Sequence, residues 1–229
     1  MKQGRFQLYG RRKSKPLRPR QQELIARLLP SLRINIEGGS AIDPAALFDG
    51  SKRDIWLEIG FGGGEHLASL AARHSDIGFI GAEPFLNGIA KLLLAIDEQR
   101  LANIRIFDND ARPLLQSLTG SSLGRVFILY PDPWPKRRHE KRRLLSLPTI
   151  SDLHRVMKPG AELHLASDSP EYMAWSLRHI LRHGGFEWLA STARDWRLPP
   201  SGWTQTRYEA KALREGRKPV YLRFARKKA

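Results

Sequence analysis

Short apolar runs alternate with longer segments of helical periodicity along most of the chain. The runs are interrupted by glycines and polar residues, a pattern typical of buried parallel strands. The predicted strands cover residues 54–59, 77–82, 104–107, 125–130, 161–166, 186–190 and 219–224. Between the runs, apolar residues recur three and four positions apart, as they do on one face of a helix. The predicted helices cover residues 21–32, 64–74, 85–100, 111–118, 148–157 and 169–183.

The alternation of strands and helices predicts an α/β fold with a doubly wound, mostly parallel sheet. The last two predicted strands are expected to complete the sheet, with an antiparallel closing strand. A chain of 229 residues suits one sizeable α/β domain. We expect residues 1–50 to form a basic N-terminal arm with a short helix, and residues 51–229 to form the main domain.

The composition of the chain excludes several classes of protein and of functional site. The chain has no cysteine, which excludes disulfide bonds, thiolate zinc sites, iron–sulfur clusters and a catalytic thiol. No apolar run is long enough to span a bilayer. The basic N-terminus is not followed by the apolar segment of a secretory signal. A soluble, cytoplasmic protein is therefore expected.

The formal net charge is +16, and it is unevenly distributed. Residues 1–20, 136–143 and 207–228 carry +8, +5 and +7, so the rest of the chain carries −4. An acidic-to-neutral body with three basic patches favours a polyphosphate partner, such as a nucleic acid. Solvated surface charge is the alternative. A membrane surface is disfavoured, because no clear basic amphipathic helix accompanies the charge.

A glycine-rich loop, Gly60-Phe61-Gly62-Gly63-Gly64, follows the first predicted strand, and Glu58 lies just before it. In a doubly wound sheet, ligands bind beyond the carboxyl ends of the strands, and glycine lets a ligand approach the backbone. The dinucleotide fingerprint requires a further glycine where this chain has Glu65, so a nicotinamide cofactor is poorly supported. The Gly-x-Gly-x-Gly pattern is instead typical of S-adenosylmethionine sites, and Glu58 would suit the cationic end of that ligand.

Acidic residues also follow the second and third predicted strands. Glu83 is placed to accept hydrogen bonds from two ribose hydroxyls. The segment Asp108-Asn109-Asp110-Ala111 offers polar groups suited to the exocyclic amine of adenine. A helix N-cap is the alternative role for Asp110. Carboxylates after three successive strands indicate an adenosyl ligand.

The fourth predicted strand ends in Tyr130-Pro131-Asp132-Pro133-Trp134-Pro135. Two prolines restrict the backbone around Asp132 and hold its carboxylate at the sheet edge, beside the expected ligand. The order differs from the Asp/Asn-Pro-Pro-aromatic motif of amino-group methyltransferases. A proline-rich turn is the alternative interpretation. The basic run over residues 136–143 favours a functional role, because it would deliver phosphate to the mouth of the same site.

In the order and spacing of these motifs, the chain resembles the bacterial tRNA (guanine-N7-)-methyltransferases of the TrmB type. The segment over residues 131–136 is highly specific. The likeness covers nearly the whole chain, in residues 57–62, 81–84 and 130–136, His139 with Arg142 and Arg143, Ser167-Asp168 with Tyr172, residues 206–209, and Arg5-Phe6 with residues 9–12. The family commonly has lysine where this chain has Arg207, and often threonine where it has Ser167.

The resemblance implies a Rossmann-like class I fold, with an S-adenosylmethionine-dependent methyltransferase domain over residues 51–229. It implies methyl transfer from S-adenosylmethionine to N7 of a variable-loop guanine in tRNA, giving 7-methylguanosine. Asp132 is the implied catalytic residue. The implied S-adenosylmethionine site is Glu58, Gly60, Glu83, Asp110, Ala111 and Asp132. The implied guanine site is Lys136, Asp168, Thr206, Arg207, Tyr208 and Glu209, and the implied RNA contacts are Arg137, Arg138, His139, Lys141, Arg142 and Arg143.

The chemistry of the implied reaction constrains the roles of these residues. Guanine N7 carries a lone pair and no proton, so direct attack on the sulfonium methyl needs positioning more than a general base. We expect Asp132 and Asp168 to hydrogen-bond the guanine and to stabilise the positive charge that grows on its ring. Because side chains cannot read N7 in the deep groove of an A-form helix, a target outside helical RNA is expected.

Two other functions compete with this interpretation. A non-catalytic RNA-binding module on the same fold predicts a broken glycine loop or a lost strand-end carboxylate, and neither is seen. A methyltransferase for another RNA base or for a protein is the second competitor, which a substrate screen would identify. We expect tRNA as partner, no membrane and no obligatory protein partner, and a monomer or homodimer.

Four aromatic side chains outside these motifs are candidates for further sites. Trp196 and Trp203 could stack on bases or pack in the core. His179 and His183 have a spacing that can bind zinc on a helix, but no third ligand lies near them in the sequence. No metal is therefore expected.

Overall fold

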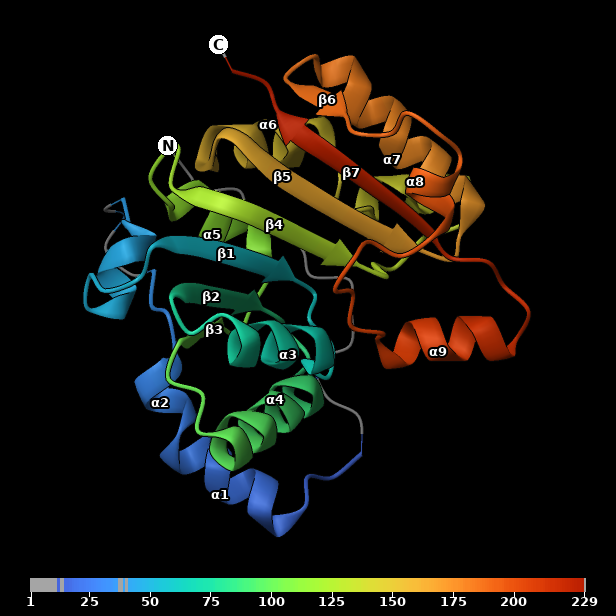
Figure 1. Ribbon diagram of the computed structural model, residues 1–229. Helices are drawn as coiled ribbons and strands as arrows, with labels where there is room; N and C mark the ends of the chain where they lie inside the picture. Colours follow the sequence, from blue (N-terminus) through green and yellow to red (C-terminus); the bar gives the residue numbers. More distant parts are fainter. Residues whose placement is uncertain (1–11, 13–14, 37–38, 40, 229) are drawn as a thin grey trace.

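The centre of the molecule is a seven-stranded sheet with the strand order β3-β2-β1-β4-β5-β7-β6 (Figure 1). The computed structural model describes residues 12, 15–36, 39 and 41–228. The strands are β1 (Asp54–Ile59), β2 (Ile77–Ala82), β3 (Ile104–Phe107), β4 (Leu123–Leu129), β5 (Met157–Ser167), β6 (Phe186–Trp188) and β7 (Val220–Arg226). From β3 to β5 neighbouring strands are parallel, whereas β7 is antiparallel to both β5 and β6. The predicted doubly wound, mostly parallel sheet with an antiparallel closing strand is confirmed.

Helices cover both faces of the sheet. One layer contains α1 (Pro19–Arg27), α3 (Glu65–Arg73) and α4 (Leu86–Gln99), and the other contains α5 (Ala111–Ser117), α6 (Leu147–Val156) and α7 (Pro170–His183). The shorter elements are α2 (Leu29–Leu32), α8 (Arg194–Arg197), α9 (Arg207–Arg214) and two 3₁₀ helices, η1 (Pro44–Phe48) and η2 (Arg137–Arg142). No helix in the described part of the chain is long and apolar enough to cross a membrane.

Strand β1 is buried on both faces, which explains its continuous apolar character. Ile55, Leu57 and Ile59 belong to the core on the side of α5, α6 and α7. Trp56 packs against the core on the side of α1, α3 and α4. The sheet is therefore the middle layer of a three-layer sandwich, and its strand ends form an edge between the layers.

The N-terminal part of the described chain packs onto this sandwich. Leu24 of α1 is completely buried, and Arg20 and Arg27 of α1 form ion pairs with Asp97 of α4. The family motif in residues 5–11 lies outside the described residues. The division of the chain at residue 50 stays a prediction.

Three local differences from the predicted elements have physical reasons. The predicted helix over 21–32 is divided into α1 and α2, because Pro30 has no backbone N–H and disrupts the helix before it. Strand β5 begins at Met157 rather than 161, with an irregular register opposite Leu123. Helix α9 was not predicted, because it is only 8 residues long, is rich in charged residues, and buries only Glu209 and Ala212.

Figure 1 shows α9 beyond the carboxyl ends of the parallel strands, apart from the two helical layers. The chain continues from β1 to β2 on one side of the sheet centre, whereas β4 pairs with β1 on the other side. The loops after β1 and β4 therefore diverge at this edge, which is the topological switch point where doubly wound sheets bind ligands.

Candidate active site

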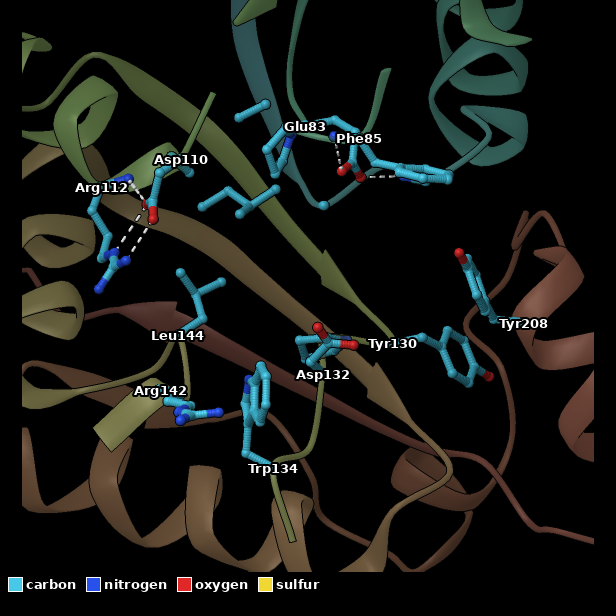
Figure 2. A pocket seen from close by; sticks show the side chains of 17 residues that line it. Glu83, Phe85, Asp110, Arg112, Tyr130, Asp132, Trp134, Arg142, Leu144 and Tyr208 are labelled. Carbon is cyan, nitrogen blue, oxygen red and sulfur yellow. Dashed lines mark hydrogen bonds and ion pairs between the residues drawn. The ribbon is translucent and has the colours of Figure 1, made fainter. Parts of the chain in front are cut away.

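A cavity of about 620 Å³ lies at the switch point between β1 and β4 (Figure 2). This volume is within the range of pockets that hold small molecules. The lining residues come from the loops that follow β1, β2, β3 and β4, and from α9: Ile59, Gly60, Gly62, Ala82, Glu83, Pro84, Phe85, Asp110, Ala111, Arg112, Tyr130, Pro131, Asp132, Trp134, Arg142, Leu144 and Tyr208. The structure thus brings together most of the residues that the sequence predicted for the cofactor.

The glycine loop forms one wall of the cavity. Gly60 and Gly62 both adopt positive φ angles, of 74° and 56°, which glycine accommodates without strain. A Cβ atom on Gly62 would lie 2.9 Å from Cε2 of Tyr208. The loop backbone is therefore in close contact with Tyr208 of α9, with no space for a side chain between them.

Glu58 lies behind the glycine loop and does not line the cavity. Its Oε2 atom is 2.7 Å from Nδ1 of His66, and both side chains are 3% exposed. A direct contact of Glu58 with a ligand stays a prediction. In this structure its carboxylate is directed to α3 instead.

The carboxylate of Glu83 is held by two backbone groups at the cavity edge. Its Oε2 accepts a hydrogen bond of 2.8 Å from the N–H of Gly62, and its Oε1 accepts one of 2.9 Å from the N–H of Phe85. Burial raises the pKa of Glu83, and these two hydrogen bonds oppose that effect. Each oxygen keeps a further lone pair, so Glu83 can still accept hydrogen bonds from a ligand.

Asp110 is an N-cap, and it also lies at the cavity, where its contact with adenine stays a prediction. As N-cap of α5 it accepts a hydrogen bond of 2.9 Å from the N–H of Arg112, and it pairs with the Arg112 guanidinium. It also lines the cavity together with Ala111 (Figure 2). Arg112 was not singled out from the sequence, although its place two residues after a capping aspartate is a usable signal.

The carboxylate of Asp132 enters the cavity from the loop after β4, on the side opposite Glu83 (Figure 2). It makes no hydrogen bond or ion pair with any residue that the structure describes. The surrounding protein atoms raise the pKa of Asp132 by desolvation, even though its side chain is open to the cavity. An unpaired carboxylate is therefore available to a substrate.

The backbone on both sides of Asp132 is unusual. Tyr130 and Trp134 have φ angles of 51° and 43°, in a region that side chains with a Cβ rarely occupy. Such outliers are often found at functional sites, where the surrounding structure holds them in place. The loop is thus fixed in a conformation that the chain would not adopt by itself.

The basic run over residues 136–143 divides into exposed and buried side chains. Lys136, Arg137, Arg138 and Lys141 are exposed, as an RNA contact requires, and His139 packs its ring edge-on against Trp134 at 5.8 Å. Arg142 lines the cavity, with its guanidinium 5.0 Å from the Trp134 ring centroid.

Arg143 departs from its predicted role as an RNA contact. Its side chain is only 1% exposed. It donates hydrogen bonds to the carbonyl oxygens of Pro133 and Trp134 and to the carboxylate of Glu171. In the sequence Arg143 has the same basic neighbours as the exposed residues of this run, so nothing there indicates that its side chain is buried.

The residues predicted for guanine are only partly gathered at the cavity. Tyr208 lines it and is half-exposed. Arg207 lies beside the glycine loop, with Nε 3.4 Å from Oε1 of Glu65. Asp168 lies outside the cavity lining and pairs with Arg217 at 3.1 Å, a partner that no pattern in the sequence indicated. Lys136 is exposed in the loop that follows Asp132.

Thr206 and Glu209 hold α9 in place rather than facing the cavity. Thr206 is the N-cap of α9 and accepts a hydrogen bond of 3.1 Å from the N–H of Glu209. Glu209 is 2% exposed, and its two oxygens accept hydrogen bonds of 2.6 Å from Nε1 of Trp203 and from the hydroxyl of Tyr221. The predicted guanine contact of Glu209 is therefore not supported by the geometry, because its carboxylate is enclosed and both oxygens already accept a hydrogen bond within the protein.

The aromatic residues outside the motifs are packed into the protein. Trp203 contacts the rings of His66 and Tyr221, at 5.2 and 5.3 Å between centroids. Trp196 packs against the core beside α7 and β7. These contacts favour core packing over base stacking for both tryptophans.

The chain is similar to known proteins over most of its length. Residues 52–222 match the family Methyltransf_4, described as "Putative methyltransferase". A tRNA (guanine-N(7)-)-methyltransferase of Agrobacterium fabrum is 51% identical over 219 residues, covering 96% of this chain and 94% of that protein. The protein of the same name from Bradyrhizobium diazoefficiens is 50% identical, covering 95% of this chain and 92% of its own length.

Solved structures share the fold at low sequence identity. The 16S rRNA methyltransferase KamB superposes with a TM-score of 0.57 at 16% identity, covering 82% of this chain and 99% of that one. The 16S rRNA (adenine(1408)-N(1))-methyltransferase of Catenulisporales acidiphilia, solved with S-adenosylmethionine as a W203A mutant, gives 0.55 at 15% identity over 81% of this chain and 91% of its own. Sequence identity near one half over almost the full length identifies the family of the chain, whereas a similar fold alone does not. The chain belongs to the tRNA (guanine-N(7)-)-methyltransferase family.

Proposed function

We propose that the protein transfers a methyl group from S-adenosylmethionine to N7 of a guanine in the variable loop of tRNA. The proposal rests on the carboxylate of Asp132, which has no partner among the described residues and enters the cavity on a loop with unusual backbone angles, continuous with the exposed basic run. The names of the relatives support tRNA as the substrate and guanine N7 as the acceptor. A cytoplasmic location is proposed with it, because that is where such a substrate is processed.

The residues around the cavity fit S-adenosylmethionine. Glu83 would accept hydrogen bonds from the ribose hydroxyls, and Asp110 with Ala111 would contact the adenine. Gly60 leaves the loop backbone accessible to the ligand, since no atom lies within 4 Å of the place a Cβ would take. When bound, S-adenosylmethionine supplies an electrophilic methyl group on a sulfonium.

The residues of this chain then have to place the guanine. N7 attacks with its lone pair and loses no proton, so no side chain has to act as a general base. Asp132 would hydrogen-bond the guanine and stabilise the positive charge that grows on the ring as the N7–methyl bond forms. Asp168 would contribute a second carboxylate after exchanging its ion pair with Arg217 for the base.

Methyl transfer from labelled S-adenosylmethionine to unmodified tRNA, followed by nucleoside analysis, tests the proposal. Label is expected in 7-methylguanosine, and a tRNA with adenine in place of the variable-loop guanine should remain unlabelled. Asp132→Asn should lower turnover strongly, whereas Glu187→Gln, an exposed carboxylate on β6, should not. Label in another nucleoside would refute the N7 assignment. Near-wild-type turnover of Asp132→Asn would refute the electrostatic role of Asp132.

A further inference from the structure

The buried guanidinium of Arg143 lies beneath the loop that carries Asp132. Its Nε donates to the carbonyl oxygen of Pro133 at 2.9 Å, and its Nη2 lies 3.3 Å from the carbonyl oxygen of Trp134. These are the two residues that directly follow Asp132. The Arg143 side chain therefore holds the loop backbone immediately beside the carboxylate that faces the substrate.

The same guanidinium also reaches the start of α7, the helix that follows the loop after β5. Its Nη2 donates a hydrogen bond of 2.7 Å to Oε1 of Glu171, in the first turn of α7. Glu171 lies three residues after Asp168, the second carboxylate proposed to contact guanine. Arg143 thus joins the two loops whose acidic side chains have to act on one base.

Packing fixes the Arg143 side chain in this position. The guanidinium lies 5.1 Å from the ring centroid of Trp175 and 5.8 Å from that of Tyr172. A buried guanidinium is stable only when it is paired and hydrogen-bonded, and its planar fork presents several donors in a fixed geometry. The positive φ angles of Tyr130 and Trp134 show that the loop needs such external support.

We propose that Arg143 is a positioning residue for the methyl-transfer reaction: it fixes the carboxylate of Asp132 relative to the Asp168 loop, and it does not contact RNA. The inference rests on the proposed function, since it assumes that Asp132 acts on the guanine. Displacement of a reacting group by about 1 Å can lower a rate by about 100-fold. We expect Arg143→Gln to lower kcat by about 10- to 100-fold, with little change in KM for tRNA.

A double-mutant cycle with Asp132→Asn separates positioning from general structural damage. If Arg143 acts through Asp132, Arg143→Gln should lower kcat strongly in the wild-type background and much less in the Asp132→Asn background. Equal losses in the two backgrounds would overturn the proposal. Arg182→Gln removes an exposed positive charge at the end of α7 and is the matched control for net charge.

The salt dependence of tRNA binding tests the RNA-contact alternative. Loss of one phosphate contact lowers the slope of log K against log salt by about 1. Arg143→Gln should keep the wild-type slope, and a slope lower by about 1 would overturn the proposal. Arg143→Lys should not restore kcat, because an ammonium lacks the fork that reaches both carbonyl groups and Glu171.

Limited trypsin digestion without ligands gives a readout that does not depend on activity. Lys136, Arg137 and Arg138 are exposed trypsin sites next to the loop. Arg143→Gln should accelerate cleavage there at least several-fold, with no acceleration in Arg182→Gln; an unchanged rate would overturn the proposal. If Arg143→Gln does not fold, Glu171→Gln takes its place in the same measurements. Failure of the wild type to form 7-methylguanosine would refute the proposed function. The digestion would still show whether Arg143 holds the Asp132 loop in place.

Discussion

The buried carboxylate of Glu209 allows a quantitative test of how α9 is held. Glu209→Met would leave the indole N–H of Trp203 and the hydroxyl of Tyr221 without their acceptor. A buried unsatisfied donor costs about 1–3 kcal/mol. Because two donors lose their acceptor, the free energy of unfolding should fall by about 2–6 kcal/mol. That is a large part of the ordinary stability of a domain, about 5–15 kcal/mol.

Glu209→Gln should behave differently, although it removes the same charge. The amide oxygen can accept from Trp203, and the amide nitrogen can donate to the hydroxyl oxygen of Tyr221, which is able to accept. The hydroxyl proton of Tyr221 then loses its acceptor, so one buried donor is left unsatisfied instead of two, at a cost of about 1–3 kcal/mol. The glutamine variant should therefore keep α9, and with it Tyr208, at the cavity.

The assays are urea unfolding followed by circular dichroism, calorimetric titration with S-adenosylmethionine, and steady-state methylation of tRNA. We expect weaker S-adenosylmethionine binding and low activity for Glu209→Met, because α9 buries little besides Glu209 and Ala212 and should detach. Glu209→Gln should lose about half as much stability as Glu209→Met, and it should resemble Glu187→Gln in S-adenosylmethionine binding and methylation. If Glu209→Gln stayed folded and kept its S-adenosylmethionine affinity but lost methylation by about 100-fold or more, the carboxylate would contact the guanine and our reasoning would be wrong.

Three further predictions concern the loop, the pH profile and RNA binding. Gly62→Ala should destabilise the protein more than Gly60→Ala in thermal unfolding. Both glycines have a positive φ, but only a Cβ at position 62 would meet Tyr208, so equal effects would contradict the contact. Desolvation raises the pKa of Asp132, and the ionised carboxylate is the active form. As the pH is lowered, kcat/KM should therefore fall through a pKa above the ordinary value for aspartate, and Asp132→Asn should lack this acidic limb of the pH profile. With about six phosphate contacts, log K for tRNA should fall by roughly 4–5 per tenfold rise in salt, and a slope near −1 would contradict a role for the basic clusters.

The strands of the sheet could be predicted from the sequence because each of them is marked by a local pattern of residues. Each parallel strand from β1 to β5 contains an apolar run that burial on both faces requires, and the strand ends carry the glycines and carboxylates of the cavity. The positions of Glu83, Asp110 and Asp132 follow from topology alone, since carboxyl ends of parallel strands meet at one edge.

The orientation of individual polar side chains could not be predicted, because distant contacts determine it. Arg143 has the same sequence surroundings as its exposed neighbours, yet it is buried by a carbonyl ten residues before it and a carboxylate 28 residues after it. Glu209 lies in a polar helix without an apolar stripe, and its burial depends on Trp203 and Tyr221. Neither arrangement leaves a periodic signal in the chain.

The place of β7 in the sheet has a consequence for biosynthesis. Strand β7 lies between β5 and β6, so a strand synthesised after both of them pairs with both. Until residues 220–226 emerge from the ribosome, the edge of β5 has unpaired backbone groups of the kind that promote aggregation. Tyr221, which donates a hydrogen bond to Glu209, is part of the same strand. A nascent chain can therefore build the parallel part of the sheet early, whereas α9 gains its contact with Tyr221 only after β7 has been inserted.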